Sequence, residues 1–397
     1  MEQSVALYSK CQKSKDDEGY GWGMAQGQGS GGIKKNKGKS GADGIMAAIG
    51  DFFHFKKHKK FWFGVLIFCA AIAVFSAVGH SMAKKEHEAY VTGLPNEARE
   101  TENVKDTFYY SQLTDREQAA YKLLEDDIAS MKGGVVTFPE KLNGTEYTRV
   151  VAALNDEDLS AFYAIVDVPM TENNVYVKKT DSDLLKITDS TIAKAILFLY
   201  PAEGIDEQGS YADDGTVQNI DQISSDLSAV NADRLKTLQD LQAKTEEALS
   251  KAVSGLPEGA GEKDALLYFL TWMKENLKAP ENLAKDANDL TTMHELFEKV
   301  YFRENISCAA DGEADTNGYA KVLCELLHRA GMEAHIVFGS WGYTETTGYV
   351  LVAAKLGDET VYIDASGANS DSLGGAQILS KAEAANHMKF NTYFQYE

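Results

Sequence analysis

The chain has 397 residues, of which 25% are charged, and its formal net charge is −21. That length allows one large domain, or two ordinary domains with extensions. The charge is uneven, because residues 1–60 hold 11 Lys against 6 Asp or Glu, whereas the rest has a net charge of −26. A region this acidic repels phosphate backbones, which excludes nucleic acid as a partner. We also expect no cofactor.

Glycine is dense from Gly19 to Gly44. Each glycine adds backbone entropy that folding would have to overcome, so such a segment does not build a packed core. We therefore predict that residues 1–60 form a disordered, Gly- and Lys-rich cytoplasmic tail.

An apolar run from Phe61 to Met82 contains no Lys, Arg, Asp or Glu. About 20 such residues in a helix cross the hydrocarbon core of a bilayer. Four lysines directly precede the run and two follow it, and lysines favour the cytoplasmic side. We predict a single-pass protein of the cell membrane, in which residues 61–82 meet the lipid bilayer, the N-terminus is cytoplasmic and the C-terminal domain is extracytoplasmic.

The chain beyond this span divides by its pattern into three parts. Residues 83–107 are polar and without periodicity, which predicts a spacer, and residues 108–255 alternate helix-like and strand-like runs, which predicts an N-terminal α+β region. Within it, Thr114 and Glu117 have the spacing of a capping box. A long helix that buries one face is predicted over 217–253, and 193–200 fits either a strand or a short helix.

The third part, residues 256–397, holds the clearest pattern. Its apolar residues from Tyr319 to Ala330 recur at helical spacing, with Asn317 available as a cap and Gly331 as a stop. Strand-like runs follow the helix, so the predicted order is a buried helix and then an antiparallel meander. The runs with strand character are 335–338, 349–354 and 360–363.

The helix opens on the sequence N-G-Y-A at Asn317, and the last strand closes on Y-I-D-A-S at Ser366. With further helices expected at 263–277 and 291–301, this order resembles the bacterial transglutaminase-like family over about residues 260–390. The resemblance implies an α+β fold with a papain-like core, a helix packed on an antiparallel sheet. Here an N-terminal α/β extension and one transmembrane helix would precede that core.

Members of this family carry a cysteine at the opening of the helix, a histidine at the start of the second strand and an aspartate at the end of the third. The resemblance puts Thr316, Tyr349 and Asp364 in these three positions. A thiol at a helix N-terminus beside an imidazole ionises and attacks a carbonyl carbon, whereas a threonine hydroxyl there does not ionise usefully. We therefore expect a degenerate, non-catalytic site, with Thr316 as a helix-capping hydroxyl.

Two of the four cysteines fall in the predicted tail and span, at Cys11 and Cys69. The other two, Cys308 and Cys324, would share the oxidising side of the membrane. A disulfide between them would close a loop of about 16 residues and contribute about 3 kcal/mol. We therefore treat them as a disulfide candidate.

Cys308 has a competing interpretation as a nucleophile. If residues 309–316 are an insertion, E-N-I-S-C would align with the family's approach to its catalytic cysteine. The insertion would detach Cys308 from the helix N-terminus, and His335 or His294 would have to act as the base.

The same loop contains a weak candidate for a calcium site at Glu313, Asp315 and Asn317. Calcium loops of this type begin on Asp and carry a bidentate Glu at the twelfth position, where this chain has Cys324. We therefore interpret the segment as a solvated acidic loop and expect no metal.

Three hypotheses for function remain. The first is a membrane-anchored, transglutaminase-like module that binds a protein or polymer of the cell envelope without catalysis. The second is a thiol peptidase or acyltransferase that works through Cys308. The third is a sensor that couples the outer domain to the cytoplasmic tail.

Overall fold

The computed structural model describes residues 85–100, 102–105, 107–167, 170–172, 175–177, 192–200, 216–218, 232–281, 297–341, 348–366 and 377–396. Within these ranges, no helix is long and apolar enough to cross a membrane. The predicted tail and the predicted span at 61–82 lie outside the described residues, so the anchor stays a prediction. Contacts divide the chain into two units, and the described residues from Pro95 onward belong to one of them.

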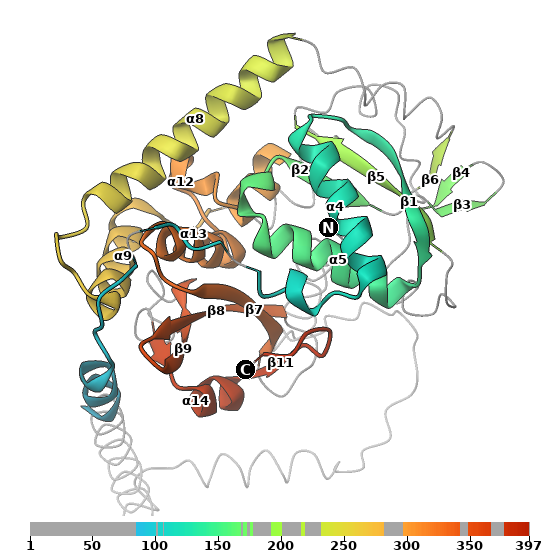
Figure 1. Cartoon of the computed structure of the whole chain (residues 1–397). Helices are drawn as coiled ribbons and strands as arrows, with labels where there is room; N and C mark the ends of the chain where they lie inside the picture. Colours follow the sequence, from blue (N-terminus) through green and yellow to red (C-terminus); the bar gives the residue numbers. More distant parts are fainter. Residues whose placement is uncertain are drawn as a thin grey trace, which may run out of the picture. The chain divides into compact units, whose positions relative to one another are not determined.

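A five-stranded antiparallel sheet forms the centre of the C-terminal part, in the order β10-β9-β8-β7-β11 (Figure 1). The turn between β8 and β9 contains Gly357, whose φ of +57° favours glycine. The three predicted runs are all strands, so the predicted meander is confirmed. The strands are β7 (Ala334–Trp341), β8 (Gly348–Leu356), β9 (Glu359–Asp364), β10 (Gln377–Leu379) and β11 (Met388–Phe390).

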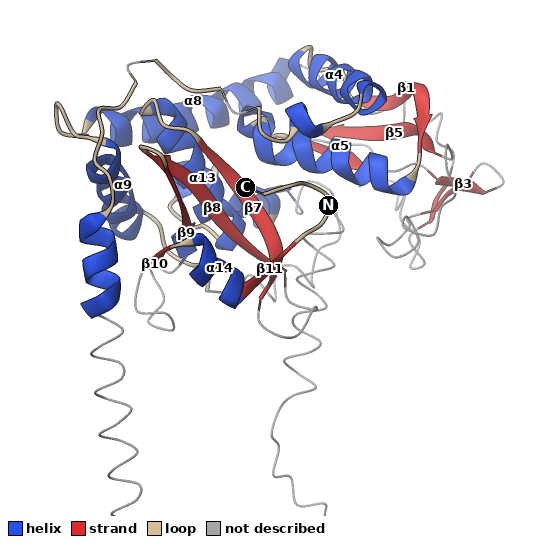
Figure 2. Ribbon diagram, turned by 60° about the horizontal axis from the view of Figure 1, so that its bottom comes forward, coloured by secondary structure: helices blue, strands red, loops and turns tan. Residues whose placement is uncertain are grey.

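Helices cover both faces of this sheet (Figure 2). The predicted helix is present as α13 (Thr316–Arg329), which packs on β7, β8 and α9 (Glu262–Asn276). On the other face, Ala384 of α14 (Lys381–His387) joins the core built on Val337, Leu351 and Ala353. Successive residues of a strand point to opposite faces of the sheet. The strand residues that alternate with Val337, Leu351 and Ala353 therefore face α13.

The N-terminal region has its own sheet, in the order β1-β5-β2, with helices α4 and α5 against it. Thr114 caps α4 in the predicted capping box with Glu117. The segment that fitted either a strand or a helix is the strand β5, whose last five residues are buried. The elements are η1 (Tyr110–Gln112), α4 (Asp115–Ala129), β1 (Gly134–Leu142), α5 (Gly144–Glu157), η2 (Leu159–Ala161), β2 (Ala164–Asp167) and β5 (Ile192–Leu199).

The prediction of one helix over 217–253 was wrong at its start. Residues 216–218 form the strand β6, which joins β3 and β4 in a small antiparallel sheet, and the helix α8 spans Ala232–Ser254. Three residues of strand carry too little periodicity to interrupt a helical pattern in the sequence. The short strands are β3 (Met170–Glu172) and β4 (Val175–Val177), and the remaining short helices are η3 (Tyr301–Glu304) and α12 (Cys308–Asp311).

The predicted spacer at 83–107 is only in part a spacer. Glu100 donates its backbone N–H to Gly331, at 3.3 Å, and Val104 donates to His328, at 3.0 Å. Residues 95–105 are therefore a strap bound along the ends of the core helices. No local pattern in the sequence indicates this docking, because the strap's hydrogen-bond partners lie in a distant part of the chain.

Candidate functional site

The site predicted from the sequence begins at the N-terminus of α13. Asp315 caps this helix, and its Oδ1 accepts a hydrogen bond from the backbone N–H of Gly318 at 2.9 Å. The prediction that Thr316 or Asn317 supplies the cap was wrong by one or two residues, because both lie inside the first helical turn. Burial raises the pKa of Asp315 to about 7, against the hydrogen bond from Gly318, which lowers it.

Tyr349 and Asp364, which the sequence resemblance pairs, contact each other in this structure. The hydroxyl of Tyr349 on β8 donates a hydrogen bond to Oδ2 of Asp364 at the end of β9, at 2.6 Å. The hydroxyl of Ser366 donates to the other carboxylate oxygen at 2.8 Å, and the side chain of Asp364 is 1% exposed. The sequence placed Tyr349 and Asp364 in paired positions, and the register of the sheet brings them together.

The chemistry of this pair differs from that of histidine and aspartate. Burial raises the pKa of Tyr349 well above its ordinary value, and the charge of Asp364 raises it further. Tyr349 is therefore a neutral phenol near pH 7, which can donate a hydrogen bond but cannot act as a general base. Among the described residues, Asp364 accepts hydrogen bonds from the hydroxyls of Tyr349 and Ser366.

Cys308 lies closer to the helix N-terminus than the sequence predicted. A Cβ added to Gly318 would lie 3.2 Å from Sγ of Cys308, so this thiol packs on the first turn of α13. The thiol is 1% exposed, and burial, followed by the charges of Asp315 and Asp311, raises its pKa well above the ordinary value. A thiol that stays protonated and buried is a poor nucleophile.

Of the two alternative bases for Cys308, only His335 lies among the described residues. His294 lies outside the described residues. His335 stacks on Phe108, with ring centroids 3.7 Å apart and planes at 5°, and burial lowers the pKa of His335 to about 4. Among the described residues, the charged groups that act on Cys308 are Asp315, Asp311 and Lys321, with no histidine.

The structure does not support the predicted disulfide, because Cys308 and Cys324 are both free and buried in it. Cys308 packs against Gly318, and Cys324 lies six residues further along the same helix, or about 9 Å at the helical rise. A disulfide requires the two Cα atoms to approach within about 7 Å. The thiol of Cys324 instead lies 3.6 Å from Nε2 of His328.

The acidic loop is engaged in the fold. Glu313 forms ion pairs with Lys278, at 3.1 Å, and with Arg303, at 3.2 Å. Asp315 is the cap of α13, so the two carboxylates of the weak calcium candidate serve separate structural contacts. No group of three or more His, Cys, Asp or Glu in the described ranges could hold a metal ion.

A buried polar cluster next to Cys308 was not predicted from the sequence. Nζ of Lys321 donates to Oδ1 of Asn305 at 2.8 Å and lies 3.8 Å from a carboxylate oxygen of Asp156 on α5. Burial raises the pKa of Asp156 to about 7, although Lys321 opposes this rise. One signal was present, since Lys321 is the single charged residue between Thr316 and Cys324, on a stretch that is otherwise apolar or small.

Comparison with known proteins gives only remote similarities. No protein-family model and no curated protein matches the chain. A solved structure described as "Crystal structure of a TGase" is similar at 14% identity and a TM-score of 0.27, over 36% of this chain and 35% of that one. A "Putative Cysteine Protease from Cytophaga hutchinsonii" is similar at 12% identity and a TM-score of 0.23, over 43% of this chain and 61% of that one.

The chain thus spans 35% and 61% of the length of these two neighbours. TM-scores this low do not establish a common fold. The protein has a mixed helix and sheet fold, and its structural neighbours include a transglutaminase and a protein described as a putative cysteine protease. In this structure α13 packs on the antiparallel sheet, and Tyr349 contacts Asp364.

Proposed function

We propose that the protein is a membrane-anchored, extracytoplasmic transglutaminase-like module that binds a protein or polymer of the cell envelope and does not catalyse a reaction. The observation that supports this most is the hydrogen bond of 2.6 Å from Tyr349 to Asp364. In the position where the family has an imidazole, this chain has a phenol with a raised pKa. Proton transfer from a nucleophile then has no acceptor near neutral pH.

The remaining nucleophile candidate also favours this proposal. Cys308 is buried, its pKa is raised, and the groups next to it are carboxylates rather than a histidine. Thr316 is half-buried and opens α13 in place of the family's cysteine. The predicted span at 61–82 supports the anchoring, and the excess of lysine before it supports the orientation.

Thiol alkylation of the full chain in detergent micelles tests the absence of catalysis. Iodoacetamide should modify Cys308 more slowly than it modifies a small-molecule thiol at pH 7, because the thiolate is scarce. The double variant Thr316→Cys/Tyr349→His should alkylate faster at position 316 than the single variant Thr316→Cys, which is the matched control. The added imidazole would take the tyrosine's place beside Asp364 and lower the pKa of the new thiol.

The enzymatic alternative gives the opposite result. Amine incorporation or peptidase activity in the unaltered protein, abolished by Cys308→Ser, would overturn the proposal. Topology is tested separately, by adding a protease outside intact spheroplasts. We expect loss of the C-terminal domain and survival of the N-terminal tail, and digestion of the tail instead would invert the orientation.

A further inference from the structure

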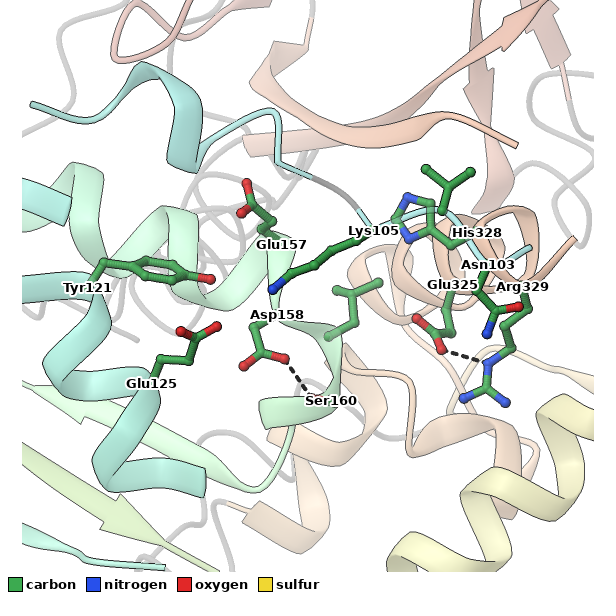
Figure 3. Close-up of a pocket in the computed structure, with 12 residues that line it drawn as sticks. Asn103, Lys105, Tyr121, Glu125, Glu157, Asp158, Ser160, Glu325, His328 and Arg329 are labelled. Atoms are coloured by element: carbon green, nitrogen blue, oxygen red, sulfur yellow. Dashed lines mark hydrogen bonds and ion pairs between the residues drawn. The ribbon is translucent and has the colours of Figure 1, made fainter. Parts of the chain in front are cut away.

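A cavity of about 240 Å³ lies where the strap, α4, the turn from α5 into η2 and the C-terminal end of α13 meet (Figure 3). The cavity lies apart from the pair of Tyr349 and Asp364, neither of which lines it. Its ionisable lining is Lys105, Tyr121, Glu125, Glu157, Asp158, Glu325, His328 and Arg329.

Three carboxylates gather at one end of the cavity, on α4 and at the end of α5 (Figure 3). Oε2 of Glu157 accepts the backbone N–H groups of Tyr109 and Tyr110, both at 2.8 Å, which fixes the position of this carboxylate. Burial raises the pKa of Glu157 to about 7 and also raises that of Asp158, and in both cases the nearby Glu125 contributes to the rise. A cation that enters the cavity would be drawn to this excess of negative charge.

Tyr121 supplies an independent sign of a ligand. Its side chain is 2% exposed, and its hydroxyl points into the cavity (Figure 3). Its ring packs on Tyr110, with centroids 5.1 Å apart, but no described residue hydrogen-bonds its hydroxyl. Burial raises the pKa of Tyr121, and the charges of Glu157 and Asp158 add to this rise, so the hydroxyl is neutral and can accept an N–H.

The chain's own Lys105 shows which chemical group suits this end. The ammonium of Lys105, carried by the strap, extends between Tyr121 and Asp158 in Figure 3 and lowers the pKa of both Glu157 and Asp158. Lys105 itself is exposed. An exposed lysine on a strap is a replaceable partner, because water and salt screen a surface ion pair and leave it little net stabilisation.

The charge balance favours a ligand with only positive groups. At the far end of the cavity, Arg329 pairs with Glu325 at 2.6 Å and with Glu246 at 2.7 Å, so its guanidinium is already matched by two carboxylates. At the near end, three carboxylates face the ammonium of Lys105. One of them, Glu125, also forms an ion pair with Lys122 at the surface. A ligand carboxylate would therefore meet mostly like charges, and a ligand ammonium would meet opposite ones.

We propose that this cavity binds a small aliphatic polyamine, whose ammonium group lies among Glu125, Glu157, Asp158 and the hydroxyl of Tyr121 in place of Lys105. A metal ion fits less well, since no group of His, Cys, Asp or Glu among the described residues is arranged to hold one. The flexible methylene chain of a polyamine would follow the cavity toward Glu325.

Calorimetric titration of the full chain in detergent micelles with spermidine tests this site. Asp158→Asn is nearly isosteric and should weaken binding about tenfold or more, the result of losing one charge-assisted hydrogen bond. Tyr121→Phe should also weaken binding about tenfold or more, because the hydroxyl that accepts a hydrogen bond from the ligand's ammonium is lost. Lys105→Met should tighten binding, because it removes the internal competitor.

A matched control separates this site from the general attraction of polyamines to a chain with a net charge of −21. Glu258 is an exposed carboxylate between α8 and α9 that does not line the cavity, so Glu258→Gln removes the same charge elsewhere. We expect spermidine binding by Glu258→Gln to equal that of the unaltered chain. The melting temperature of each variant reports whether it folds. If Asp158→Asn does not fold, Lys105→Met still tests the proposal, because it changes an exposed residue.

The pH dependence provides a second measurement. Glu157 faces Glu125 and Tyr121 from α4, Lys105 from the strap, His328 from α13 and its own neighbour Asp158. A carboxyl with a pKa near 7 is about one tenth ionised at pH 6 and nine tenths at pH 8, so spermidine affinity should rise up to about tenfold over this range at constant ionic strength. Four outcomes would each overturn the proposal. They are no binding of spermidine, an equal loss of affinity in Asp158→Asn and Glu258→Gln, weaker binding by Lys105→Met, and tighter binding of Mg²⁺ than of spermidine.

Discussion

The packing of Cys308 against α13 predicts that Gly318 accepts no side chain. An added Cβ would overlap the carbonyl oxygen of Arg303 and would lie 3.1 Å from its carbonyl carbon and 3.2 Å from Sγ of Cys308. That carbonyl also accepts a hydrogen bond from the backbone N–H of Asp315 at 3.0 Å, so it cannot move without breaking this bond. The steric conflict is therefore with fixed backbone rather than with the end of a flexible side chain.

The magnitude follows from three contributions to the free energy of unfolding. Overpacking a buried site costs about 1–3 kcal/mol. Loss of the hydrogen bond from Asp315 to Arg303 adds about 1 kcal/mol, and the higher helix propensity of alanine offsets about 1 kcal/mol. Gly318→Ala should thus destabilise the protein by about 1–3 kcal/mol, or roughly 2–10 °C in melting temperature for a unit of this size.

Thermal denaturation of the full chain, followed by circular dichroism, measures this loss, and alkylation by iodoacetamide should show faster labelling of Cys308. Gly93→Ala is the matched control, because a Cβ there meets no atom within 4 Å. It should change stability by less than about 0.5 kcal/mol. If Gly318→Ala melts at the temperature of the unaltered protein, Cys308 does not pack on α13 in the way described, and its inertness would need another cause.

Three further predictions concern buried ionisable groups. The pKa of His335 falls from about 6.5 in the unfolded chain to about 4 in the folded protein. The unfolded state therefore binds more protons between these pH values, and stability drops as the pH falls through them. His335→Phe should remove this acid dependence, as measured by urea denaturation. The pKa of Asp156 rises to about 7, so its contribution makes stability decline as the pH rises from about 4 to 7. Asp156→Asn should make that decline shallower and leave the part that Asp315 and Glu157 contribute. Lys321→Met should cost about 3–5 kcal/mol at pH 8, where it leaves Asp156 charged and buried, and clearly less at pH 5, where Asp156 is protonated.

The sequence predicted best what depends on a regular local pattern. The helix α13 and the strands β7, β8 and β9 were found because apolar residues recur at fixed spacing over several turns or alternations. The family resemblance then placed Tyr349 and Asp364 in partnered positions, and the structure joins them. That contact depends on strand register, which the strands themselves determine.

Contacts between distant segments were beyond the reach of the sequence. Lys321 and Asp156 are 165 positions apart, and neither has a pattern that indicates the other. The thiols of Cys308 and Cys324 suggested a pair because of their compartment, but a disulfide depends on a distance that only the packing of α13 decides. The sequence likewise does not distinguish Tyr121 from the other buried residues of α4, because the local pattern does not indicate where its hydroxyl points.

Arg99 offers a test of how the strap is held. Its Nε donates to the carbonyl of Ala260 at 2.8 Å and its Nη1 to the carbonyl of Ala330 at 2.7 Å, which ties the strap to the ends of two helices. Each charge-assisted bond contributes about 1.5–3 kcal/mol, so Arg99→Ala should open the strap locally. The core should remain folded, because neither carbonyl belongs to the sheet.

Hydrogen exchange resolved by mass spectrometry measures this opening. The backbone amides of Glu100 and Val104, which bond to the end of α13, should exchange at least tenfold faster in Arg99→Ala, while amides of β8 keep their protection. Arg99→Lys is the matched control, since it keeps the charge and one donor and should show an intermediate rate. If the strap exchanges equally fast in all three proteins, Arg99 does not hold it. Residues 95–105 would then act as the free spacer that the sequence alone predicted.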